Sequence, residues 1–285
     1  MAGPAAQMRE NDGIREPYLE TDTMSSESTV LWSAQDGIGR ITLNRPEGAN
    51  ALNRRSARDL AAAIDGVAAA AGLKVVVLSA RGTMYCGGGD IAEFVQHADG
   101  LPALVDDILS PLLASFERLA SLPVPIVSVV NGPFGGAGIA MALVGDFVMA
   151  ADTIKVRGGY VALGLSPDLA ASWLLVRRVG VARARQIFML NRPLDAERCL
   201  QWGLVDELWP ADQLQAQAEK VITQFATGPT ASYARVKDLC ARAEHNSLAE
   251  HLQLERKYLV ERAGSADARE GVRAFIEKRP ARFGG

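Results

Sequence analysis

Residues 130–141 constrain the fold of this chain more than any other stretch. An apolar run at 125–130 has the composition of a short buried strand, and the run at 139–144 has that of a helix. Between them lies the glycine-dense segment Gly-Pro-Phe-Gly-Gly-Ala-Gly, residues 132–138. A strand that passes through glycines directly into a helix leaves backbone N–H groups unobstructed, which suits an oxygen that carries negative charge. A tight turn packed against its own helix would explain the same glycines.

A second glycine turn lies upstream, Cys-Gly-Gly-Gly-Asp at residues 86–90, and it also follows a predicted strand, residues 74–79. Two amide-rich turns of this kind could reach one carbonyl oxygen from different directions. That is the arrangement of an oxyanion hole. The two turns together are therefore a stronger indication of function than either is alone.

Strand and helix patterns alternate along the first three quarters of the chain. Predicted strands at 29–33 and 39–43 are joined by an Asp-Gly hairpin turn, and a helix is expected at 54–71. A helical turn at 91–97, a helix at 104–119 and two short apolar runs at 146–150 and 154–156 follow. This alternation favours an α/β core with parallel strands. From residue 214 onward only helical patterns occur, at residues 214–225, 231–243, 248–263 and 266–277.

Composition limits the possible functions. The chain has 285 residues, 48% of them hydrophobic, enough for a large core in one or two domains. A formal net charge of −3 argues against a general nucleic-acid binder, and no apolar run reaches the roughly 18–20 residues of a membrane span.

Charged residues interrupt residues 1–28, which we expect to form a disordered arm. Cys86, Cys199 and Cys240 are widely spaced, without metal-like pairing, and indicate a reducing cytoplasm.

Several ordered motifs match one known family. They are Ile-Thr-Leu-Asn-Arg-Pro at 41–46, Asn-Ala-Leu-Asn at 50–53, the two glycine turns, Leu-Gly-Leu-Ser-Pro-Asp at 163–168, Trp-Gly-Leu-Val-Asp at 202–206 and Ala-Phe-Ile-Glu-Lys-Arg at 274–279. From about residue 30 to 283 the sequence resembles the crotonase, or enoyl-CoA hydratase/isomerase, superfamily. The resemblance implies a spiral of β-β-α units over residues 29–213 and a helical region over 214–285 that forms trimers or pairs of trimers.

The resemblance also implies the substrate and its binding residues. The substrate would be an acyl-CoA thioester, without a permanently bound cofactor or metal. The backbone N–H groups of Gly89 and Ala137 would hold the thioester oxygen while an enolate forms. Residues expected to contact coenzyme A are Asn50, Ala51 and Leu52, through their backbone, and Phe275 and Lys278, from the last helix, often that of a neighbouring subunit.

The expected acid–base residues are unusual. Hydratases of this family use two glutamates, and the corresponding positions here are Ala140 and Tyr160. One carboxylate remains, Asp168 in Ser-Pro-Asp, which relatives that isomerise CoA esters also carry. Asp168 could instead cap a helix predicted at residues 169–176. Tyr160 and Trp173 are candidates for the substrate pocket, although either could simply pack in the core.

We therefore expect an enoyl-CoA isomerase in which Asp168 removes a proton at one carbon and returns it at another. Three alternatives stay open: a hydratase with a non-standard water site, an aromatic acyl-CoA dehalogenase or hydrolase with Asp168 as nucleophile, and an acyl-CoA-binding protein without turnover. Residues 91–113 are expected to line the acyl pocket.

Overall fold

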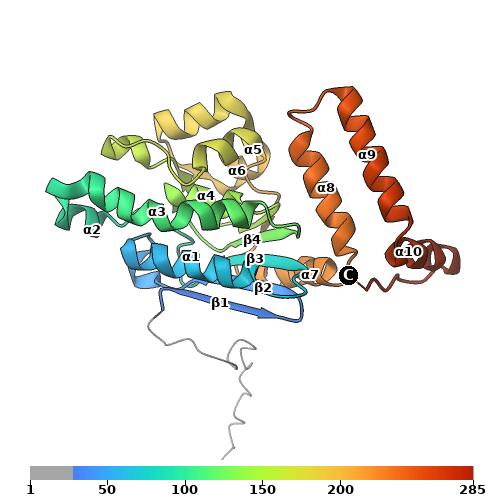
Figure 1. The fold of residues 1–285 in the computed structure, drawn as a ribbon. Coiled ribbons are helices and arrows are strands. Elements are labelled where there is room, and N and C mark those ends of the chain that lie inside the picture. Colours follow the sequence, from blue (N-terminus) through green and yellow to red (C-terminus); the bar gives the residue numbers. More distant parts are fainter. Residues whose placement is uncertain (1–27, 285) are drawn as a thin grey trace, which may run out of the picture.

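The computed structural model describes residues 28–284, and Figure 1 shows their arrangement. The arm expected over residues 1–28 therefore lies, apart from Ser28, outside the described residues. The main sheet has six strands in the order β1-β2-β3-β4-β6-β9. Their bounds are β1 (Val30–Gln35), β2 (Ile38–Leu43), β3 (Val75–Ala80), β4 (Ile126–Val130), β6 (Phe147–Ala151) and β9 (Glu207–Trp209).

Strand pairing in this sheet is parallel except at one edge. β1 and β2 form an antiparallel hairpin, and the remaining neighbours in the sheet pair in parallel. The hairpin turns at Asp36 and Gly37, whose φ angles of 52° and 79° fit the Asp-Gly turn that the sequence predicts. The expected α/β architecture with a parallel core is confirmed. Strands β3, β4 and β6 each lie within one residue of their predicted positions.

Helices that follow the strands bury apolar stripes against the sheet. Helix α1 (Arg54–Ala68) starts with a capping box between Asn53 and Ser56, and its side chains at Leu60, Ile64 and Val67 are buried at helical spacing. It packs on β1, β2 and α3 (Leu101–Ala120). The wholly buried helix α4 (Ala137–Leu143) packs on β4 and on α5 (Ala171–Arg185), which is interrupted at Gly180. Two shorter helices are α2 (Ile91–Gln96) and α6 (Ala196–Trp202).

A second, three-stranded sheet positions the downstream glycine turn. It consists of β5 (Phe134–Gly135), β7 (Lys155–Arg157) and β8 (Leu194–Asp195), in that order. Sequence patterns predict β7 but not β5 or β8, because two residues are too few for an apolar period. Irregular helical segments lie at η1 (Pro46–Gly48), η2 (Ala98–Gly100), η3 (Tyr160–Leu163) and η4 (Gln186–Leu190).

The four C-terminal helices fall within one residue of their predicted bounds. They are α7 (Leu214–Ala226), α8 (Thr230–Arg242), α9 (Leu248–Ala263) and α10 (Ala266–Glu277). Helix α7 packs on β3, β4 and β6, whereas α8, α9 and α10 project from the body of the molecule (Figure 1). Among residues 28–284, no helix is long and apolar enough to cross a bilayer.

Asn50 ties the loop after β2 to the upstream glycine turn. Its buried side chain accepts a hydrogen bond from the Arg45 N–H at 2.8 Å and donates to the carbonyls of Arg81 at 2.9 Å and Met84 at 2.8 Å. Its φ of 51° is left-handed, a conformation that asparagine tolerates better than most residues.

We expect Asn50→Ala to lower the free energy of unfolding by about 2–4 kcal/mol, because it removes three hydrogen bonds and leaves two carbonyls unpaired. The isosteric Asn50→Asp should also destabilise, since a carboxylate cannot donate to those carbonyls. Chemical denaturation measures both. An unfolding midpoint equal to that of the unchanged chain would contradict this role.

Candidate active site

The two glycine turns contact each other through their backbones. Gly88 has a φ of +95°, and a Cβ there would lie 3.0 Å from the carbonyl oxygen of Gly135 and 3.3 Å from the Cα of Gly136. The N–H of Gly135 donates to the carbonyl of Cys86 at 3.1 Å. Glycine is required at 88 because a side chain would separate the turns and would force an unfavourable backbone conformation.

Two N–H groups at this contact lack an acceptor in the described part of the chain. Gly89 forms a parallel bridge with Leu52, in which Leu52 donates to Gly88 at 2.7 Å and accepts from Asp90 at 2.9 Å. The ladder pattern leaves the N–H of Gly89 directed away from Leu52. Ala137 begins α4, where an N–H has no partner within the helix. Both residues line one cavity.

This cavity has a volume of about 830 Å³ and mostly apolar walls. The expected wall within residues 91–113 comes from α2 and α3 and comprises Ile91, Phe94, Val105, Ile108, Leu109 and Leu113. A second wall, which the sequence did not indicate, comes from η3 and the segment after η4 and includes Ala162, Leu163, Leu165, Asn191 and Pro193. The volume and the mostly apolar walls suit an acyl group.

Asp168 and Tyr160 face each other at this cavity. The Tyr160 hydroxyl donates to Asp168 Oδ1 at 2.6 Å. Burial raises the pKa of Asp168 above its usual range, and the Tyr160 hydroxyl opposes that rise. Burial, followed by the neighbouring charge of Asp168, raises the pKa of Tyr160, so its hydroxyl stays protonated. Asp168 is the one carboxylate among the described residues that line the cavity.

Asp168 does not cap the following helix. Helix α5 begins at Ala171, two residues later than predicted, and its N-cap residue Ala170 makes no side-chain cap. Leu169 and Ala170 have φ angles of 44° and 61°, a left-handed turn that separates Asp168 from the helix. The capping alternative is therefore wrong, and the carboxylate is directed to Tyr160 instead.

Trp173 is not a pocket residue in this chain. Its side chain is 54% exposed on α5, and the guanidinium carbon of Arg177 stands 3.5 Å from the ring centre. The buried side of α5 carries Ala171, Leu175 and Val179, and Trp173 lies off this stripe. The pocket prediction for Trp173 is thus wrong because α5 presents a different face. Ala140 lies in the buried core of α4 and does not line the cavity.

The residues expected to bind coenzyme A are not all near the cavity. Leu52 lines it, while Asn50 and Ala51 are buried and Asn50 has the structural role described above. Phe275, 85% exposed on α10, and Lys278, exposed where α10 ends, line neither this cavity nor the one described next. Within one chain, the fold does not bring the last helix to the site.

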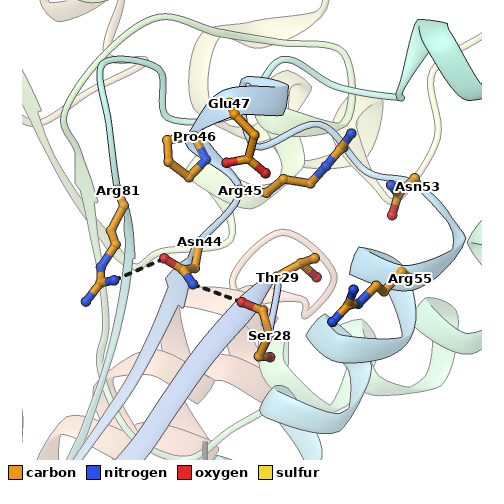
Figure 2. A pocket seen from close by; sticks show the side chains of 9 residues that line it. All are labelled: Ser28, Thr29, Asn44, Arg45, Pro46, Glu47, Asn53, Arg55 and Arg81. Carbon is orange, nitrogen blue, oxygen red and sulfur yellow. Dashed lines mark hydrogen bonds between the residues drawn. The ribbon is translucent and has the colours of Figure 1, made fainter. Parts of the chain in front are cut away.

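A second cavity, of about 520 Å³, lies against the loop between β2 and α1 (Figure 2). Its walls are polar and include the arginines Arg45, Arg55 and Arg81. Arg45 pairs with Asp90 at 2.6 Å. Asp90 caps α2 through the N–H groups of Ala92 and Glu93, the structural role expected of a turn residue. Burial opposes ionisation of Asp90, but Arg45 and these N–H groups hold its pKa below the usual value.

Two other groups play no direct part in the cavity. Burial raises the pKa of the Cys86 thiol to about 11, so this cysteine is an unreactive filler beneath the upstream turn. His97 contacts Arg54 at 3.2 Å and does not line the cavity. Within residues 28–284, no group of three or more histidine, cysteine or acidic residues is arranged to hold a metal ion.

Comparison with known proteins supports the resemblance seen in the sequence. Residues 33–285 match the family model described as enoyl-CoA hydratase/isomerase. The chain is 35% identical to 1,2-epoxyphenylacetyl-CoA isomerase of Escherichia coli, over 90% of this chain and 98% of that protein. It is 34% identical, with the same coverage, to a probable enoyl-CoA hydratase of Rhodobacter capsulatus.

A third relative, 30% identical over 90% of this chain and 98% of its own length, is a trans-2-decenoyl-[acyl-carrier-protein] isomerase of Streptococcus mutans. Among solved structures, a putative enoyl-CoA hydratase/isomerase from Mycobacterium abscessus superposes with a TM-score of 0.85 at 32% identity, covering 90% of this chain and 99% of that one. These matches extend over the fold and over both glycine turns. The chain belongs to the enoyl-CoA hydratase/isomerase family, the crotonase superfamily.

Proposed function

We propose that this protein is an acyl-CoA isomerase that moves a double bond, with Asp168 as its acid–base group. The proposal is carried by one observation: among the residues that the structure describes, Asp168 is the one carboxylate on the wall of a cavity that is also lined by Gly89 and Ala137, whose N–H groups have no acceptor there. Gly89 and Ala137 would donate to the thioester oxygen, which becomes negatively charged when a proton leaves the adjacent carbon. Asp168 would take that proton and return it two carbons along the chain.

The same geometry makes hydration the second candidate. Adding water across a double bond needs a positioned water in addition to a proton donor, and the two expected glutamate positions hold a buried alanine and a tyrosine. Relatives of similar identity carry the names of a hydratase and of isomerases. The absence of a second carboxylate from the described cavity wall favours isomerisation.

Coenzyme A would lie along the loop between the two cavities. The carbonyl of Asn50 accepts no hydrogen bond from the described residues and could receive the adenine amino group. The three arginines of the polar cavity would favour the nucleotide phosphates nearby (Figure 2). Phe275 and Lys278 would complete this site from a neighbouring subunit.

We propose that α8, α9 and α10 form the contacts of a trimer or a pair of trimers. These helices bury one residue within the chain, Ala274. Large apolar side chains on α9 and α10 are more than half exposed: Leu248, Leu252, Leu259, Val260, Val272, Phe275 and Ile276. This many exposed large apolar side chains on two helices favour an interface.

We expect light scattering after size-exclusion chromatography to give three or six times the chain mass. Placing a charge in the proposed interface, as in Leu259→Glu, should reduce that mass because an unpaired buried charge opposes association. A monomer at micromolar concentration in the unchanged protein would contradict the assembly.

We expect Asp168→Asn to lower the turnover of a 3-enoyl-CoA to its 2-enoyl isomer by about 10²–10⁴-fold, because a neutral amide is too weak a base to accept the proton. Chromatography with mass detection separates the isomers and also detects the gain of water that hydration would cause. Asp152→Asn, an exposed aspartate between β6 and β7, is the matched control and should keep full activity. Unchanged activity in Asp168→Asn would remove Asp168 from the mechanism.

The pH dependence should follow the raised pKa of Asp168. Asp168 must be ionised to act as a base. The decrease of kcat/KM in acid should therefore be centred at a pH above about 3.9, the ordinary pKa of aspartate. Folding, in contrast, favours the protonated form of Asp168, because its pKa is higher in the folded than in the unfolded protein. The protonated carboxyl therefore contributes its full stability below the unfolded-state pKa of Asp168, and this contribution is lost as the pH rises through the folded-state pKa.

This sign predicts that Asp168→Asn melts at a higher temperature than the unchanged protein at pH 7, and that the difference shrinks as the pH falls toward 4. Scanning calorimetry across this range measures the difference. A melting gap that widens in acid would show that the carboxylate stabilises the fold instead.

A further inference from the structure

Tyr160 is held more firmly than a pocket-lining aromatic requires. Its side chain is buried at 7% exposure, and its ring packs against Phe188 with 5.9 Å between ring centres. The preceding residue, Gly159, donates its N–H to Asn191 Oδ1 at 2.7 Å and has a φ of +85°. These contacts fix both the backbone and the ring, so the position of the hydroxyl is set before any substrate arrives.

That hydroxyl is the main partner of the Asp168 side chain. It donates to Oδ1 at 2.6 Å. Oδ2 has no other side chain as a hydrogen-bond partner among the described residues. Asp168 precedes the left-handed residues Leu169 and Ala170 and therefore lies outside α5. Its carboxylate does not cap the helix, so the hydrogen bond from Tyr160 is what restrains it.

A direct proton-transfer role for Tyr160 fits the geometry less well. Its proton is already directed at Asp168, and burial keeps the hydroxyl protonated. The titratable and charged groups around Asp168 are Tyr160, the buried thiol of Cys86 from the upstream turn, and Lys155 and Arg157 of β7 on the cavity wall. Among the described residues, only Tyr160 of this set donates a hydrogen bond to the carboxylate, and its donor–acceptor distance of 2.6 Å is short.

We propose that Tyr160 is a positioning residue, whose hydroxyl fixes Oδ1 of Asp168 so that Oδ2 is the oxygen presented to the substrate. The proposal rests on the role proposed above for Asp168. It assigns a purpose to the tyrosine at a position where hydratases of the family have a glutamate. The hydrogen bond from Tyr160 would have two effects. It holds the carboxylate in one orientation, and it favours the ionised form, which is the form that can accept a proton.

The test is Tyr160→Phe, which keeps the ring and removes the hydroxyl. A carboxylate free to rotate should lower kcat by about 10–100-fold with little change in KM, because misplacement of a reacting group by about 1 Å can cost 10²-fold. Loss of the donor should also move the acid limb of the kcat/KM profile to higher pH, because the hydroxyl opposes the rise in the pKa of Asp168.

Tyr258→Phe is a matched control. The Tyr258 hydroxyl donates to Asp238 Oδ2 at 2.6 Å, between α9 and α8 and away from the cavity. It removes a tyrosine–aspartate hydrogen bond of the same length, and we expect its pH profile to match that of the unchanged protein. Calorimetry of both variants confirms that each is folded.

A readout independent of turnover separates this proposal from the proposed function. Protein labelled with ¹³C at its aspartate carboxyls is examined by infrared spectroscopy as a function of pH. The carboxyl signal that is missing from the Asp168→Asn variant belongs to Asp168, and its pH dependence gives the titration of that residue. A titration that moves to higher pH in Tyr160→Phe and stays in place in Tyr258→Phe supports the restraint, even if no ester tested is isomerised.

Two results would overturn the proposal. One is unchanged kcat in Tyr160→Phe. The other is a fall in kcat with both the pH profile and the infrared titration unmoved, which would make Tyr160 a packing residue only. Failure of the unchanged protein to convert any ester, with the titration shifted as expected, would count against the isomerase assignment and leave the Tyr160–Asp168 restraint established.

Discussion

The contact between the two glycine turns is the constraint on which the rest of the site depends. Gly88 approaches Gly135 and Gly136 so closely that no side chain fits between them. Strands β3 and β4 are parallel neighbours in the sheet, so the turns that follow them leave the same edge and meet. The small second sheet then fixes the downstream turn through the pairing of Gly135 with Arg157. Backbone geometry alone thereby brings two N–H donors to one cavity.

The acid–base group is added to this backbone platform by a local departure from regular structure. Two left-handed residues follow Asp168, so α5 begins only at Ala171. The Asp168 carboxylate does not cap the helix and accepts a hydrogen bond from the Tyr160 hydroxyl. Left-handed conformations cost roughly 1–2 kcal/mol for residues other than glycine, and a buried carboxylate costs more. A buried carboxylate on a strained turn is characteristic of a functional site, and the cavity beside it is lined by two residues whose N–H groups have no acceptor among residues 28–284.

Sequence patterns predicted the long elements and the two turns closely, because apolar periods and glycine clusters are local signals. They missed β5 and β8, which are two residues long and pair with β7, and they also missed the short elements α6 and β9. They also placed α5 too early: residues 169 and 170 look helical by composition, and only the packing around Asp168 excludes that. The pocket prediction for Trp173 failed for a separate reason: the face that a helix buries depends on how the helix is oriented against its neighbours, which the sequence does not show. The arginines of the polar cavity come from segments distant in sequence, so nothing local marks them as a group.

Infrared spectroscopy of a bound, saturated acyl-CoA labelled with ¹³C at its thioester carbonyl tests the shared oxyanion site most directly. If the N–H groups of Gly89 and Ala137 both donate to that oxygen, the carbonyl stretch should lie at a lower frequency than in water. Gly88→Ala, which forces the turns apart, should return it toward the solution value. A bound carbonyl with the frequency found in water, or one that Gly88→Ala leaves unchanged, would show that the two turns do not act together on the thioester.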